Sequence, residues 1–121
     1  MKESLRYETS LIDKPWGSEL IWALSDHYCG KFLTVNAGES LSLQYHQRKD
    51  ESWYVLEGFA KLEFGRSDKE METIQIREGD AFRFVPGMRH RVTAIERLRV
   101  VEVSTPDIED VVRIEDRYGR A

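Results

Sequence analysis

Several features that would define a class of protein are scarce in this sequence. Its 121 residues include one cysteine, Cys29, so an intramolecular disulfide is excluded. No run approaches the ~18 consecutive apolar residues of a membrane-spanning helix, and no long stretch repeats apolar residues at the helical period. The formal net charge of −4 argues against binding to nucleic acid or another polyanion. We therefore expect neither a membrane nor a nucleic-acid partner.

The composition that remains is that of a folded globular domain. Hydrophobic residues make up 40% of the chain and charged residues 33%, a balance that allows one packed core. The length suits a single domain. Lys2, Glu3 and Arg6 stand where a secretory signal would need an apolar run. The expected location is therefore cytoplasmic.

Short segments of alternating, β-branched or aromatic character dominate the chain. They cover residues 20–22, 31–35, 41–45, 53–56, 60–64, 73–76, 81–85, 91–95 and 98–103. Glycine, asparagine and proline separate many of them, which is typical of turns. Regularly spaced short strands predict an all-β sandwich or barrel. We expect one domain over residues 1–121, with a barrel core at about 18–105, an N-terminal arm at 1–17 and a C-terminal segment at 106–121.

Four polar residues form a candidate metal site. Gln44 and His46 are two residues apart, so their side chains project from the same face of a strand. A short turn after His46 would return the chain antiparallel and set Glu51 beside it, while His90 opens a later strand. Two imidazoles, a carboxylate and an amide oxygen suit a divalent ion such as Zn, Mn, Fe, Co or Ni. The alternative is that the two histidines are unrelated surface or core residues.

Two motifs carry a resemblance to a known superfamily. Residues 38–58 have the spacing G-x7-H-x4-E-x6-G and resemble the first cupin motif. Residues 79–90 have the spacing G-x7-G-x2-H and resemble the second. Gln44 stands where the first motif usually has a histidine, and Pro86 lies one residue closer to His90 than the motif's proline. The resemblance implies a single-domain cupin barrel of the double-stranded β-helix, jelly-roll type, with metal ligands Gln44, His46, Glu51 and His90.

Three further stretches resemble one branch of the cupins. The sequences KPWG at residues 14–17, GESLSLQ at 38–44 and VRIEDRYGR at 112–120 are similar to the cupin domain of type II phosphomannose isomerases. That family has a glutamine at the position of Gln44. It often has a further histidine where this chain has Arg48. In the family the domain usually follows a mannose-1-phosphate guanylyltransferase domain, which these residues do not include.

The resemblance implies reversible conversion of mannose 6-phosphate to fructose 6-phosphate through a cis-enediol. Such chemistry needs a base, a group that stabilises the enediolate and cations for the phosphate. Arg113 is the residue expected beside the enediolate, and Lys31 is expected to contact the sugar or phosphate. Glu115 is a candidate for the base, as is Asp116, although Glu115 is expected to share a strand face with Arg113 and could only position it.

Other readings stay open at this point. Arg113 with Glu115 could be a surface ion pair of little energetic worth, and Lys31 could be an exposed structural residue. The domain could bind a carbohydrate or sugar phosphate without catalysis, or isomerise or epimerise another sugar. We also expect a homodimer, because a small barrel leaves sheet edges that need cover, and the segment Leu11–Trp22 is the candidate for that contact.

Overall fold

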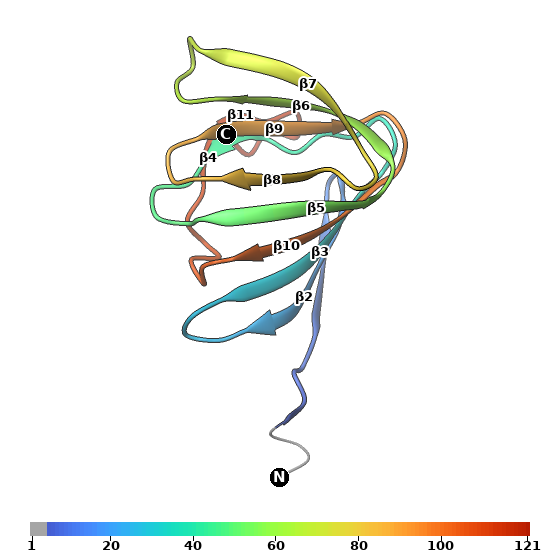
Figure 1. Ribbon diagram of the computed structural model, residues 1–121, viewed down its shortest axis with the longest axis vertical. Helices are drawn as coiled ribbons and strands as arrows, with labels where there is room; N and C mark the ends of the chain where they lie inside the picture. Colours follow the sequence, from blue (N-terminus) through green and yellow to red (C-terminus); the bar gives the residue numbers. More distant parts are fainter. Residues whose placement is uncertain (1–4) are drawn as a thin grey trace.

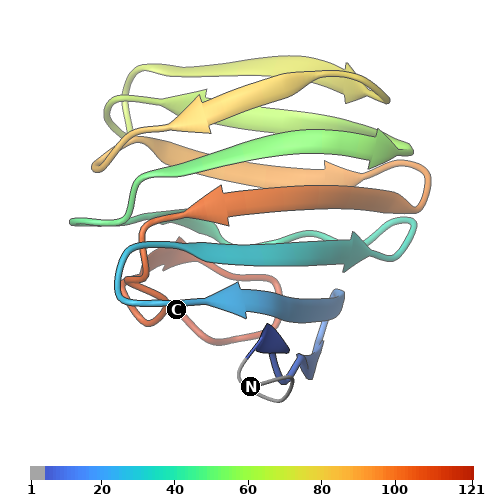
Figure 2. The same cartoon turned by 60° about the horizontal axis from the view of Figure 1, so that its bottom comes forward.

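The computed structural model describes residues 5–121, which form two antiparallel β-sheets facing each other as layers (Figure 1). The six-stranded sheet has the order β1 (Ser10–Lys14), β2 (Gly17–Leu24), β3 (Cys29–Val35), β10 (Leu98–Ser104), β5 (Glu51–Glu57) and β8 (Ala81–Phe84). The five-stranded sheet has the order β11 (Val112–Glu115), β4 (Leu43–Tyr45), β9 (Arg89–Ala94), β6 (Phe59–Gly65) and β7 (Met71–Arg77). Figure 2 shows the strands of the six-stranded sheet lying side by side. The all-β single-domain prediction is confirmed.

Each strand segment expected from the sequence overlaps an observed strand, and two further strands lie in the segments outside the expected core. Residues 10–14, within the expected arm, form β1 and pair antiparallel with β2. All but one of these five residues are exposed, so no buried alternating face marked this strand in the sequence. The second of these further strands is β11, in the C-terminal segment, which pairs with β4. The charged residues Lys2 and Glu3, used for the expected location, lie outside the described residues.

The inner faces of the two sheets are apolar at one end of the barrel and polar at the other. Along β10 the inward side chains run from Leu98 and Val100 to Glu102, and all three are buried. The neighbouring strand β5 follows the same order: Val100 lies opposite Val55 in the apolar half, and Glu102 lies opposite Trp53 at the border of the polar half. Alternating burial therefore builds a hydrophobic core at one end and a buried polar site at the other.

β1 is an edge strand of the six-stranded sheet and presents apolar side chains to solvent. Leu11 is 67% exposed and Trp22, on the neighbouring strand, is 37% exposed. Both lie in the segment expected to join two copies of the chain, and that pairing stays a prediction. In the described part of the chain, no helix has the length and apolar character needed to cross a bilayer.

Candidate metal centre and cavity

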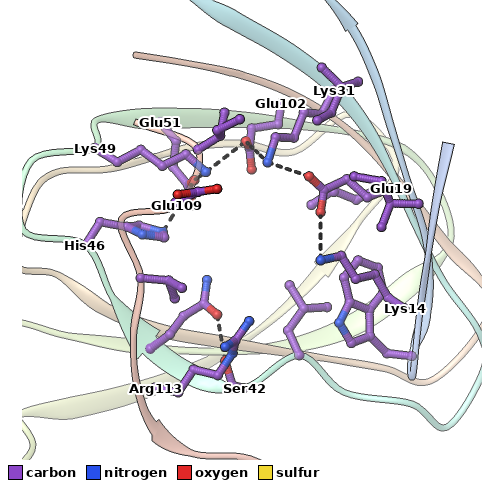
Figure 3. A pocket seen from close by; sticks show the side chains of 18 of the residues that line it. Lys14, Glu19, Lys31, Ser42, His46, Lys49, Glu51, Glu102, Glu109 and Arg113 are labelled. Atoms are coloured by element: carbon purple, nitrogen blue, oxygen red, sulfur yellow. Dashed lines mark hydrogen bonds and ion pairs between the residues drawn. The ribbon is translucent and has the colours of Figure 1, made fainter. Parts of the chain in front are cut away.

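The polar end of the barrel surrounds a cavity of about 330 Å³ (Figure 3). Both sheets contribute to its wall, and so does the segment that joins β10 to β11. Its charged lining residues are Lys14, Glu19, Lys31, Lys49, Glu51, Glu102, Glu109, Arg113 and Arg120. Acidic and basic side chains alternate around the wall, so the cavity suits a ligand that carries both hydroxyl groups and negative charge.

His46, Glu51 and His90 come together beside this cavity. Their ligand atoms all lie within 4.8 Å of one another, and all three residues are buried. Glu51 Oε1 is 3.1 Å from His90 Nε2, and Glu51 Oε2 is 3.6 Å from His46 Nε2. The turn at Gly87, whose φ of 86° suits glycine, donates its N–H to the carbonyl of His46 over 2.7 Å. This bond ties the start of β9 to the end of β4.

Both imidazole rings are oriented by backbone carbonyls. His46 Nδ1 donates to the carbonyl oxygen of Asp110, and His90 Nδ1 donates to that of Met88 over 3.1 Å. The Nε2 atoms are buried and have no hydrogen-bond partner among residues 5–121. Buried polar atoms rarely stay unpartnered, and a carbonyl on the far nitrogen is the usual support of a metal-ligating imidazole. The donor set therefore fits a divalent ion.

Gln44 lies on the cavity wall next to these three residues. It is the register partner of His90 across the β4–β9 pair. Its Oε1 accepts a hydrogen bond of 2.6 Å from Ser42 Oγ. An amide oxygen has two lone pairs, so this bond leaves one for a metal ion. The geometry is compatible with the fourth ligand that the sequence predicts.

A buried network of charges continues from Glu51, and sequence reasoning missed most of it. Lys49 Nζ lies 2.7 Å from Glu51 Oε2 and 3.1 Å from Glu102 Oε2. Trp53 Nε1 donates to the other oxygen of Glu102 over 3.0 Å. Lys31 Nζ lies 2.6 Å from Glu19 and 4.0 Å from Glu102. Glu102 is therefore the hub that two buried lysines and an indole share.

The pKa directions follow from burial and from these neighbours. Burial alone would lower the pKa of Lys49, but the charges of Glu102 and Glu51 outweigh it and raise that pKa. For Glu51, burial would raise the pKa, but the two neighbouring imidazoles and the charge of Lys49 outweigh it, so the pKa of Glu51 falls well below the usual range. Burial and the charge of Glu51 raise the pKa of Glu102. Lys49 is therefore an ammonium and Glu51 a carboxylate at neutral pH.

A usable signal for Glu102 was present in the sequence. Leu98, Val100 and Glu102 follow one another at period two, so an acid occupies the third position of an apolar inward face. A buried carboxylate needs partners, which would have directed attention to inward-facing lysines. Lys49 had no comparable pattern, because it lies in the turn between β4 and β5.

Of the three residues assigned to the reaction from the sequence, the structure brings two to the cavity. Lys31 is 6% exposed and lines the wall, so it is not an exposed structural residue. Arg113 also lines the wall, and its Nε is buried without a partner in the described chain. Trp53 faces inward, where it joins the core and the cavity wall.

Glu115 lies outside the cavity, contrary to the expectation that it shares a face with Arg113. The β11–β4 register shifts between the two residues, so Arg113 lies opposite Gln44 while Glu115 lies opposite Leu43. Neighbouring residues on a strand point to opposite faces. The shift therefore turns Glu115 outward, where its exposed carboxylate is 3.0 Å from Arg91 Nη1.

Asp116 also lies outside the cavity wall, but it fixes a residue that lines it. Its carboxylate accepts hydrogen bonds from Arg120 N, Nε and Nη2 at 2.7, 2.8 and 2.9 Å. Arg120 then reaches the cavity. Hydrogen bonds from the Arg120 side chain are the main cause that lowers the pKa of Asp116 to about 2 from 3.8.

This pKa predicts a pH dependence for the C-terminal turn. Because the folded pKa is below the unfolded one, the stabilisation is present above about pH 4 and is lost as the pH falls toward 2. A carbon-13 NMR titration of the Asp116 carboxyl should give a midpoint near 2, and the midpoint should rise toward 3.8 in Arg120→Ala. An ordinary midpoint in the unsubstituted protein would contradict the assignment.

The sequence matches a family model over most of its length. The model described as "Mannose-6-phosphate isomerase C-terminal" matches residues 2–116. Mannose-1-phosphate guanylyltransferase of Escherichia coli K12 is 35% identical over 113 residues, which are 90% of this chain. The xanthan biosynthesis protein XanB of Xanthomonas campestris and the alginate biosynthesis protein AlgA of Pseudomonas aeruginosa are each 30% identical over 114 residues, again 90% of the chain. The chain spans 23% of the length of each of these relatives.

Similar solved structures include oxalate decarboxylases. The formate complex of the Lactobacillus farciminis enzyme has a TM-score of 0.74 and 18% identity, over 88% of this chain and 33% of that one. A Bacillus subtilis oxalate decarboxylase studied for its Mn(II) centres has a TM-score of 0.74 and 23% identity, over 87% and 30%. At this identity the likeness shows the fold alone, and it confirms the predicted cupin barrel.

Proposed function

The chain belongs to the family of the mannose-6-phosphate isomerase C-terminal domain, and from this premise we propose that it is a metal-dependent isomerase. Its substrates are mannose 6-phosphate and fructose 6-phosphate, interconverted through a cis-enediol. The observation that carries the proposal is the pair of buried, unpartnered Nε2 atoms that converge with Glu51 beside a cavity lined by cationic side chains.

Gln44, His46, Glu51 and His90 are the residues that would hold the ion, which is Zn, Mn, Co, Ni or Fe. A divalent ion bound there supplies a Lewis acid for the oxygens at C1 and C2 of the sugar. The ammonium of Lys49 lies 2.7 Å from Glu51 and partly neutralises the charge of that carboxylate. This contact weakens the carboxylate as a donor and so favours a more electrophilic centre.

The cationic side chains lie in different parts of the cavity wall, some beside the metal ligands and some opposite them. Arg113 is the register partner of Gln44, so it lies next to the metal ligands and suits the enediolate. Lys14 lies across the cavity from His46, where it suits the phosphate at C6 (Figure 3). Arg120 adds a further cation to the wall. Lys31 Nζ holds Glu19 at 2.6 Å and lies 4.0 Å from Glu102, beyond hydrogen-bond distance, so ammonium protons are left for a sugar oxygen.

Glu109 is the carboxylate that we assign to proton transfer. It reaches the cavity from the segment between β10 and β11 (Figure 3). The other cavity carboxylates are committed, because Glu51 faces the imidazoles while Glu19 and Glu102 hold lysines. A base needs a carboxylate that can approach the C1 and C2 protons without first breaking an ion pair.

An isomerase assay tests the proposed function. Metal-free protein is loaded in turn with Mn, Co, Zn, Ni or Fe(II), the last without oxygen, and fructose 6-phosphate formed from mannose 6-phosphate is measured. Turnover with at least one ion is expected, and unphosphorylated mannose should be a much poorer substrate. Absence of turnover with every ion would contradict the proposal, and saturable binding by calorimetry would then favour a sugar-phosphate-binding domain.

The same assay tests Glu109. Glu109→Gln keeps the shape of the side chain and removes the base, so kcat should fall by ~10²-fold or more while KM changes little. The metal content should stay that of the unsubstituted protein. An unchanged kcat would remove Glu109 from the reaction.

A further inference from the structure

The segment that joins β10 to β11, residues 105–111, is fastened to the metal centre by one residue. Asp110 lies in this segment, and its carboxylate accepts three backbone N–H groups, from Gln47 at 3.1 Å, Arg48 at 2.6 Å and Lys49 at 2.9 Å. Those three residues form the turn between the ligands His46 and Glu51. A carboxylate that accepts several backbone N–H bonds fixes the conformation of the turn that supplies them.

The main chain of Asp110 contacts the metal-ligating residue His46 directly. The carbonyl oxygen of Asp110 accepts the hydrogen bond from His46 Nδ1. The Asp110 carboxylate therefore holds the turn at residues 47–49, and the Asp110 carbonyl holds the imidazole of His46 just before it. The imidazole is kept with its proton on Nδ1 and its Nε2 toward Glu51. Glu109, the residue before Asp110, lines the cavity, so Asp110 also connects the cavity wall to the metal ligands.

We propose that Asp110 is a positioning residue for the metal centre: it sets the tautomer and ring orientation of His46 and couples the cavity segment to the ligand turn. The proposal rests on the proposed function only for the identity of the bound group. Groups that orient metal-ligating histidines typically change metal affinity by 10–100-fold when they are removed.

Asp107 provides a matched control in the same segment. Its carboxylate contacts Thr105 Oγ1 at 2.8 Å and the Arg48 side chain at 3.4 Å, but it accepts none of the three backbone N–H groups that Asp110 holds. Asp107→Ala therefore removes an acidic residue from the same segment without releasing the turn. Asp110→Ala removes the three bonds, and Asp110→Asn keeps a side chain of the same size with one acceptor oxygen.

The test combines two measurements on each variant. Long-range nitrogen-15 NMR of the metal-free protein reports the His46 tautomer, and calorimetric titration with Mn(II) or Co(II) reports affinity. In the unsubstituted protein the proton should reside on Nδ1. Asp110→Ala should give mixed tautomers and 10–100-fold weaker affinity, Asp110→Asn a smaller loss, and Asp107→Ala a change of less than about twofold.

Several results would overturn the proposal. One is an unchanged His46 tautomer and metal affinity in Asp110→Ala. Another is a loss of metal affinity in Asp107→Ala equal to that in Asp110→Ala, because it would show only a general loosening of the segment. If Asp110→Ala does not fold, Asp110→Asn decides, and its unchanged tautomer and affinity would overturn the proposal. If the unsubstituted protein binds no divalent ion, the proposed function fails, while the tautomer in the metal-free protein still decides the role of Asp110.

Discussion

Glu102→Ala is expected to destabilise the protein by about 3–5 kcal/mol, because it removes a buried carboxylate that two buried cations share. Glu102 is 3% exposed and holds Lys49 at 3.1 Å, with Lys31 at 4.0 Å and the Trp53 indole at 3.0 Å. Lys49 would keep only Glu51, and the indole N–H would lose its acceptor. Chemical denaturation followed by tryptophan fluorescence measures the loss, and the melting temperature should fall by roughly 10 °C or more.

Glu57→Ala is the control for this experiment. Glu57 forms an ion pair of 2.7 Å with Arg97, but the two side chains are 48% and 59% exposed. Solvent screens such a pair, so its loss should cost less than about 1 kcal/mol. A loss below about 1 kcal/mol in Glu102→Ala as well would contradict the role of Glu102 as the hub of a buried network.

Arg113→Ala should separate activity from stability. Its Nε is buried without a partner in residues 5–121, so removing the side chain breaks little that holds the fold together. Because Arg113 lies beside the metal ligands, we expect kcat to fall by about 10²–10³-fold, as it does when a donor to a developing oxyanion is removed. Steady-state kinetics with mannose 6-phosphate and a denaturation curve on the same preparation measure the two effects.

Arg91→Ala is the matched control, since Arg91 contacts Glu63 at 2.9 Å and Glu115 at 3.0 Å outside the cavity. Its loss should leave kcat within about twofold, which is below 0.5 kcal/mol of barrier. An Arg113→Ala variant with full activity would contradict the assigned role. So would a fall in stability as large as that of Glu102→Ala, because it would show a structural rather than a catalytic role.

The two sheets and the convergence of His46, Glu51 and His90 could be foreseen because they depend on regular geometry. Period-two alternation decides which residues share a face, and a short antiparallel connection puts Glu51 next to His46. Trp53, two residues after Glu51 on the same strand, faces inward by the same rule. Where strands are regular, a single sequence therefore determined the local arrangement.

The remaining features depend on irregular backbone or on packing between distant segments. Glu115 was placed beside Arg113 by alternation, but the register shift in β11 breaks that rule. Asp110 binds a turn more than 60 positions earlier, at 61 to 63 residues' separation. No local pattern encodes such a contact. β1 escaped notice because its side chains have no buried face.

The most direct test of the metal centre is a titration of metal-free protein with Co(II), followed by visible absorption. Two imidazoles, one carboxylate and one amide oxygen should give d–d bands that rise linearly and saturate at one ion per chain. Absorption that never saturates, or no bands at millimolar Co(II), would contradict the assignment of His46, Glu51 and His90 as metal ligands.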